Sequence, residues 1–246
     1  MSRAPQRPAV DRLDAEKVAY WYFRLNGFLQ IENFVVHPER GGSQRTDADL
    51  LGIRFPFRAE RLFDDPNDIM TDDLRCLALS GDLIDVVIAE VKTGRCALNG
   101  PWTLQERQNV HRVLAAIGCL PPDGIEAAAA DIYRSGFHLS DTPLRIRLVA
   151  VGRDHSEELA AEYPEVTQLL WAEMLAFIWN RYHHYRRQKT QVQQWDPVGR
   201  KIKRLADQSE DAQDFIGQAL HLMDVRIDYP ISRLPDLIGG RLRPNG

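Results

Sequence analysis

The sequence predicts an α/β protein in which helices pack around a mixed sheet. Three observations support this class. Apolar residues recur at helical spacing in residues 13–27, three extended segments follow, and an amphipathic stretch then precedes a fourth extended segment. The third extended segment, residues 82–92, is a nearly continuous apolar run, typical of a central strand that is covered on both faces. The expected order is therefore helix, three strands, helix and strand.

Local signals justify the first elements. Gly27 follows the periodic apolar stretch and is a common helix stop, so the first helix ends there. Extended segments are expected over residues 28–37 and 46–57, separated by Pro38 and a glycine-rich turn. The acidic residues 59–81 are expected to form an irregular insertion before the third strand.

The later elements follow from the same signals. Residues 103–118 carry an apolar stripe typical of a helix, and residues 143–152 read as the fourth strand. Beyond residue 157 the pattern turns helical. Residues 163–190 are expected to form one long helix, with further helices near residues 198–208 and 211–223.

Length and composition set the class of protein. With 246 residues, of which 44% are hydrophobic, the chain can bury one substantial core and a small appendage. We divide it into a core, residues 1–155, and a C-terminal helical extension, residues 156–246. No apolar run is long enough for a membrane span, and the first residues do not resemble a signal peptide, so a cytoplasmic location is expected. The three cysteines do not indicate a disulfide framework.

Positive charge is concentrated in one segment. The chain has a formal net charge of −4, yet residues 181–204 contain eight Lys and Arg against one acid, Asp196. Such a segment favours contact with a polyanion, and the alternatives are a solvated helix face or a dock for an acidic partner. The candidate nucleic-acid contacts are Arg186, Arg187, Lys189, Arg200, Lys203 and Arg204.

An acid and a base end the third strand. Glu90 and Lys92 lie two positions apart and so point to the same face, and Asp49 belongs to the neighbouring strand. Two carboxylates this close repel each other unless a cation lies between them, and oxygen ligands suit Mg²⁺ or Mn²⁺. A lysine beside that cation can hold or deprotonate a water. The alternative is a salt bridge at the sheet edge.

These segments resemble the PD-(D/E)XK nuclease superfamily over residues 14–152, through "AEKVAYWYFRLNGF", "IENF", "TDADLLGIRF" and "DVVIAEVKTG". They are most similar to its Holliday-junction-resolvase-like and RecB-like branch. The resemblance implies a restriction-endonuclease-like αβββαβ core, with Asp49 and Glu90 as metal ligands and Lys92 as the catalytic lysine. It also implies that Glu16 is a further carboxylate of the site. Asp47, on the same face as Asp49, is an auxiliary candidate.

The expected function is metal-dependent hydrolysis of phosphodiester bonds, with DNA as the substrate. RNA is an alternative, because the metal chemistry treats both backbones alike. A different alternative is a nuclease-like fold that acts as a nucleic-acid-binding or assembly subunit. In that case the C-terminal helices would dock onto a partner protein or a second copy of the chain.

Overall fold

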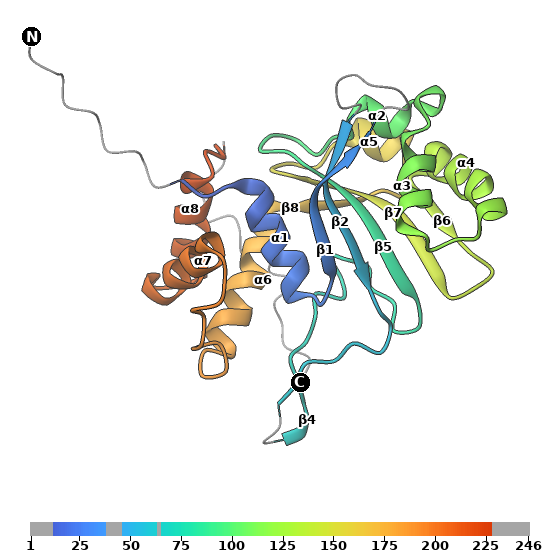
Figure 1. Ribbon diagram of the computed structural model, residues 1–246. Coiled ribbons are helices and arrows are strands. Elements are labelled where there is room, and N and C mark those ends of the chain that lie inside the picture. Colours follow the sequence, from blue (N-terminus) through green and yellow to red (C-terminus); the bar gives the residue numbers. More distant parts are fainter. Residues whose placement is uncertain (1–11, 38–45, 63–64, 228–246) are drawn as a thin grey trace, which may run out of the picture.

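A mixed sheet of six strands forms the centre of the described molecule, which comprises residues 12–37, 46–62 and 65–227 of a computed structural model (Figure 1). Its strands are β1 (Leu29–Val36), β2 (Thr46–Arg54), β5 (Ile84–Val91), β6 (Phe137–Leu139), β7 (Leu144–Gly152) and β8 (Thr167–Leu170). They lie in the order β1-β2-β5-β7-β6, and β8 also pairs with β7. The β1-β2, β2-β5 and β6-β7 pairs are antiparallel, whereas β5-β7 and β7-β8 are parallel. This confirms the α/β class with a mixed sheet.

Helices form a layer on each side of this sheet, as Figure 1 shows. One layer contains α1 (Ala15–Leu25), α6 (Trp171–His184), α7 (Pro197–Gln208) and α8 (Ala212–Leu222). The other contains α3 (Asn109–Ile117) and α4 (Ile125–Ser135). The short helices α2 (Gly100–Thr103) and α5 (Glu157–Glu162) lie together at one end of the sheet, and 3-10 turns cover Gln105–Arg107 and Pro122–Gly124.

Strand β5 separates two apolar cores. Val87 and Ala89 belong to the cluster that includes residues of α1 and α6. Val86 and Ile88 belong to the cluster that includes residues of α3 and α4. Because alternate side chains of a strand point to opposite faces, a strand that is covered on both faces needs an apolar residue at nearly every position. The apolar run at residues 82–92 is therefore explained, and its placement at the sheet centre is confirmed.

Helix α1 lies within the predicted residues 13–27 and ends just before Gly27, as expected. The side chain of Asp14 caps the N-terminus by accepting hydrogen bonds from the backbone N–H groups of Glu16 (2.9 Å) and Lys17 (3.3 Å). Gly27 follows the helix with a φ of +80°, a conformation that favours glycine. The cap fixes the first turn of α1, which carries Glu16.

The C-terminal part differs from the sequence prediction. Residues 163–190 do not form one helix, because β8 pairs in parallel with the end of β7. Helix α6 ends at His184, and residues 185–189 form a turn. The boundary expected after residue 155 falls between β7 and α5, and β8 beyond it belongs to the central sheet.

Three other segments contain elements that the sequence did not indicate. Residues 103–118 are not one helix, since α2 ends at Thr103 and α3 begins at Asn109. Helix α4 and strand β6 lie in a region for which we predicted no element. The insertion at residues 59–81 contains a second sheet, which pairs β3 (Arg61–Leu62) with β4 (Asp65–Ile69).

An ion-pair network joins this insertion to α6. Asp72 accepts hydrogen bonds from the guanidinium groups of Arg54 (2.9 Å), Arg58 and Arg181 (3.2 Å). Glu60 pairs with Arg58 (3.1 Å) and Arg181 (3.5 Å). The Arg181 side chain is only 1% exposed, so its charge depends on these carboxylates and on the backbone. The insertion is therefore fixed against the helical layer.

We expect Gly199→Ala to destabilise the protein. A Cβ atom at Gly199 in α7 would overlap the ring of Trp21 in α1, which is buried and donates a hydrogen bond to Asp196 (2.9 Å). Alanine normally favours a helix over glycine, but overpacking costs about 1–3 kcal/mol. For a protein of this size, each kcal/mol of lost stability lowers the melting temperature by roughly 2–4 °C. Thermal unfolding of the variant measures the effect.

The matched control for this prediction is Gly124→Ala. Its added Cβ would lie 3.7 Å from the nearest atom, which is ordinary contact, and its φ is −85°. We expect a change within about 0.5 kcal/mol. Equal melting temperatures for Gly199→Ala and the parent would show that α7 does not pack against α1 as described.

Candidate active site

Two acidic side chains meet at one end of the antiparallel β2-β5 pair. The ladder has Leu50 opposite Ala89, and the next residues along the two strands are Asp49 and Glu90. The carboxylate of Asp49 accepts a hydrogen bond from the backbone N–H of Val91 (2.6 Å). The side chain of Asp49 is therefore anchored to the end of β5, next to Glu90.

Glu90 is almost fully buried, and both its carboxylate oxygens have donors. Its Oε1 accepts hydrogen bonds from Lys92 Nζ and Asn99 Nδ2, and its Oε2 accepts one from Trp102 Nε1 (2.9 Å). Its residue exposure is 1%. These donors fix the orientation of the carboxylate and offset part of the cost of its burial.

Lys92 directly follows β5, and its backbone is held on two sides. Its N–H donates to the carbonyl of Val151 in β7 (2.9 Å), and its carbonyl accepts from Trp171 Nε1 at the start of α6 (2.8 Å). The side chain remains 32% exposed. A fixed backbone thus presents a half-buried ammonium group beside Glu90.

Glu16 lies in the same electrostatic environment. Its pKa is raised above 4.5 mainly by burial, then by the charges of Asp49, Asp14 and Asp47, while Lys92 acts in the opposite direction. The structure therefore brings Glu16, from α1, near Asp49 and Lys92. Asp47, the auxiliary candidate, lies near enough to Glu16 and Asp49 for its charge to raise their pKa values.

The two central carboxylates have raised pKa values. For Asp49 burial is the main cause, the Val91 N–H and Lys92 oppose it, and Asp47 adds to it. For Glu90 burial is again the main cause, the hydrogen bond from Lys92 opposes it, and the charge of Asp49 adds to it. Neighbouring acids with raised pKa values are a surplus of negative charge that a bound cation would neutralise.

The donor set suits a hard divalent cation. Within residues 12–37, 46–62 and 65–227, no three His, Cys, Asp or Glu side chains converge on one point as a metal cage. Mg²⁺ is commonly held by one or two carboxylates, with waters and substrate phosphates completing its shell. Asp49 and Glu90 supply such a pair, so these residues fit Mg²⁺ or Mn²⁺.

Sequence reasoning missed two residues of the site, Asn99 and Trp102. Both lie at α2, after the strand motif, and contact Glu90 only because α2 folds over the end of β5. A buried tryptophan needs an acceptor for its N–H, but nothing in the local sequence says which one.

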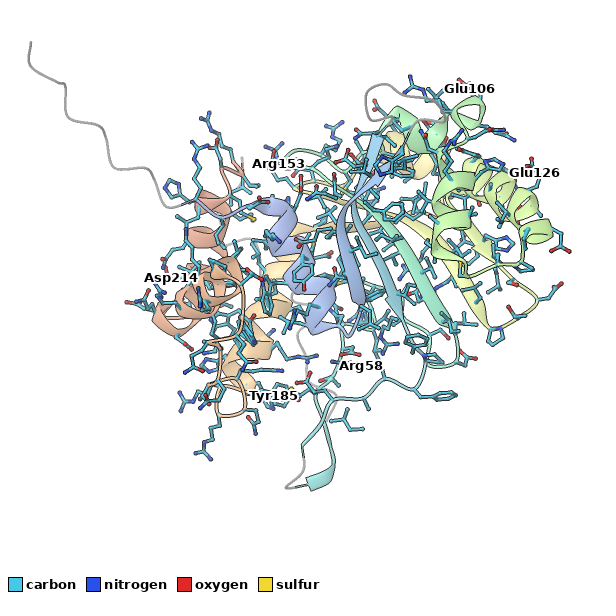
Figure 2. The ribbon with its side chains drawn as sticks, viewed as in Figure 1. Arg58, Glu106, Glu126, Arg153, Tyr185 and Asp214 are labelled. Atoms are coloured by element: carbon cyan, nitrogen blue, oxygen red, sulfur yellow. The ribbon has the colours of Figure 1, made fainter. Side chains whose placement is uncertain are left out.

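The basic residues that follow α6 lie away from this site. In Figure 2, Tyr185 at the end of α6 lies far from Arg153, which follows β7 next to the strand ends. Arg186, Arg187, Arg200 and Arg204 are exposed. Lys189 pairs with Glu60, and Lys203 is buried and pairs with Asp207. The helix on which we expected Arg186 and Lys189 ends before them.

Comparisons with known proteins do not extend this description. No family model, curated protein or solved structure matches the chain. Among the described helices, none combines the length and the apolar character needed to cross a bilayer. The function is therefore inferred from the geometry of the site.

Proposed function

We propose that the protein is a metal-dependent nuclease that hydrolyses phosphodiester bonds, with DNA as the substrate. The observation that carries this proposal is the meeting of Asp49, Glu90 and Lys92 at one end of the β2-β5 pair. Glu16 completes the acidic group from α1. The same residues carry the resemblance to the PD-(D/E)XK superfamily and its restriction-endonuclease-like core.

Each residue has a distinct role. Asp49 and Glu90 would hold Mg²⁺ or Mn²⁺, which supplies charge neutralisation at the phosphate and a more acidic water. The Val91 N–H orients Asp49, and Asn99 and Trp102 orient Glu90. The Lys92 ammonium, half-buried beside Glu90, holds the attacking water and stabilises negative charge on the phosphate. Hydrolysis would then form one P–O bond to the water oxygen and break the P–O bond to the leaving sugar, while the water loses one proton and the leaving sugar oxygen gains one.

A binding or assembly subunit is the second candidate, and one observation favours it. Both carboxylate oxygens of Glu90 accept hydrogen bonds from protein groups, which belong to Lys92, Asn99 and Trp102. The charges of Glu90 and Lys92 can therefore persist as a structural ion pair. In such a protein the C-terminal helices would contact a partner or a second copy.

Incubation of the purified protein with nucleic acids distinguishes the two candidates. Linear, circular and single-stranded DNA and RNA are each tested with Mg²⁺, Mn²⁺ or EDTA. We expect DNA cleavage that requires the metal and is absent in Asp49→Asn. Binding without cleavage in every metal condition would support the binding subunit, and cleavage of RNA alone would change the substrate.

We expect Trp102→Phe to weaken divalent-ion binding and cleavage by about 10–100-fold, the usual effect of losing a partner that orients a metal ligand. Phenylalanine keeps most of the buried ring but removes the N–H that donates to Glu90 Oε2. Calorimetric titration with Mn²⁺ and initial cleavage rates measure the two effects.

Trp179→Phe is the matched control. The Trp179 Nε1 is buried and has no hydrogen-bond partner, so its removal costs nothing at the site. We expect parental Mn²⁺ affinity and rate in this variant. If both tryptophan variants behave like the parent, the Trp102 N–H does not orient a metal ligand.

A further inference from the structure

A cavity of about 490 Å³ opens between the turn that follows α6 and helix α7. It is lined by Arg186, Arg187, Lys189, Thr190, Val192, Lys203 and Asp207. Four of these seven residues are basic. The cavity belongs to neither the candidate active site nor the sheet, so its charge requires a separate explanation.

The positive charge of the cavity comes mainly from two arginines. Lys189 is paired with Glu60, and Lys203 with Asp207, so both lysines are largely neutralised. Arg186 and Arg187 are exposed, and no ion pair engages either of them within the described ranges. A guanidinium group carries a planar set of N–H donors that matches phosphate oxygens. The two arginines are therefore available to a phosphate ligand.

The walls of the cavity are fixed before any ligand binds. The turn is closed by the backbone N–H groups of Gln188 and Lys189, which donate to the carbonyl of Tyr185 (3.1 and 3.0 Å). The pair of Lys189 with Glu60 ties this turn to the network of Arg58 and Arg181. A site that needs little ordering loses less entropy when it binds a ligand.

The opposite wall is equally constrained. Lys203 in α7 is 6% exposed, and its ammonium lies 5.9 Å from the centre of the Tyr182 ring while it pairs with Asp207. This pairing also neutralises the one carboxylate that lines the cavity. An anion in the cavity would therefore meet the two arginines without facing an unpaired acid.

We propose that this cavity binds a backbone phosphate of the nucleic acid at a distance from the bond that is cleaved. The start of α6 contacts Lys92 and its end leads into the cavity. A helix of 14 residues spans roughly 20 Å, the length of about six base pairs at 3.4 Å each. The inference rests on the proposed function and adds that the substrate is a polymer that extends beyond the active site.

Binding is measured without cleavage, in EDTA, with a labelled 20-base-pair DNA duplex over a range of salt concentrations. The test variant is Arg186→Gln with Arg187→Gln. The control is Arg134→Gln with Arg226→Gln, which removes the same charge from exposed arginines outside the cavity. Lys189 is left in place because it also holds Glu60.

We expect the cavity variant to bind more weakly and to lose about one unit of the log–log salt slope, which is near 0.9 for each phosphate contact. The control should keep the parental slope. Equal losses in both variants would show a diffuse basic field and overturn the proposal, as would an unchanged slope in both.

Inorganic phosphate is the second probe. We expect it to compete weakly with the duplex in the parent and not in the cavity variant. If phosphate binding depends on the two arginines but duplex binding does not, the cavity is a small-anion site, and the proposal is wrong.

Two outcomes separate this inference from the proposed function. If duplex binding depends on the two arginines but no substrate is cleaved, the cavity assignment stands and the proposed nuclease function is wrong. If cleavage depends on the metal but duplex binding is unaffected by the loss of both arginines, the proposed nuclease function stands and the cavity assignment is wrong.

Discussion

Replacing Asp49 with asparagine will reduce cleavage by about 10³-fold or more, because in the proposed nuclease it would remove a charged oxygen ligand of a metal that contributes several kcal/mol to catalysis. The asparagine carbonyl can still accept the hydrogen bond from the Val91 N–H. The strand pairing at this end of β2 should therefore persist. The measurements are the initial rate with Mg²⁺ and the Mn²⁺ affinity.

The same variant should be more stable than the parent when no metal is present. The pKa values of Asp49 and Glu90 are raised above their ordinary 3.8 and 4.5. Their protonated forms are thus favoured in the folded state, and the stability this provides is complete at low pH. It is lost as the pH rises through the folded pKa values. Asp49→Asn removes one ionised acid, so its melting temperature should exceed the parental one at pH 7, with the gap narrowing toward pH 4.

Asp47→Asn is the control for this prediction. It lies two residues away on β2 and carries the same charge, but Asp49 is the one that meets the end of β5. We expect a loss of cleavage well below that of Asp49→Asn. A larger loss in Asp47→Asn would show that Asp47 rather than Asp49 is the metal ligand. Parental rates in both variants would refute the site.

Lys92→Ala will lose cleavage by about 10²–10⁴-fold, the usual range for a group that handles a proton or a water in the transition state. Binding of metal and of duplex should remain. The backbone of Lys92 is held by Val151 and Trp171 whatever its side chain, and Glu90 keeps its donors Asn99 and Trp102. The single-turnover rate and the duplex affinity separate chemistry from binding.

Lys92→Arg should restore little, because a guanidinium group is planar, larger and always protonated. Lys17→Ala is the control, since Lys17 pairs with Glu32 and its side chain is 36% exposed, against 32% for Lys92. We expect no loss of cleavage in the control. A Lys92→Ala variant that cleaves at the parental rate would make Lys92 only the partner of Glu90 in an ion pair.

The elements that the sequence predicted correctly are those with strong local signals. Helix α1 has its cap and stop within its own sequence, and β5 has the apolar run that two covered faces require. Strand β8 has no such signal. Its four residues continue directly into α6, and they are extended because β7 offers them a parallel partner. That pairing depends on residues nearly twenty positions earlier.

The site shows the same division. Asp49, Glu90 and Lys92 could be placed together from strand alternation and adjacency alone, although an insertion separates β2 from β5 in the chain. The contacts of Asn99 and Trp102 could not be predicted, because they depend on how α2 folds back.

The basic segment followed the same rule. Its charge was visible in the sequence, but the partners of its lysines were not. Glu60 lies 129 positions before Lys189, and their pairing depends on the fold of the insertion.

The insertion also bears on how far the chain can be shortened. It lies between β2 and β5 of the central sheet and contains an irregular hairpin, so its position alone suggests that a shortened chain could omit it. Yet Asp72 and Glu60, both in the insertion, neutralise the charge of Arg181, which is buried in helix α6. Trimming the insertion would leave that guanidinium group without a counter-charge, at a cost of about 3–5 kcal/mol. The smallest autonomous unit of this protein therefore includes both the insertion and the helices that follow the sheet.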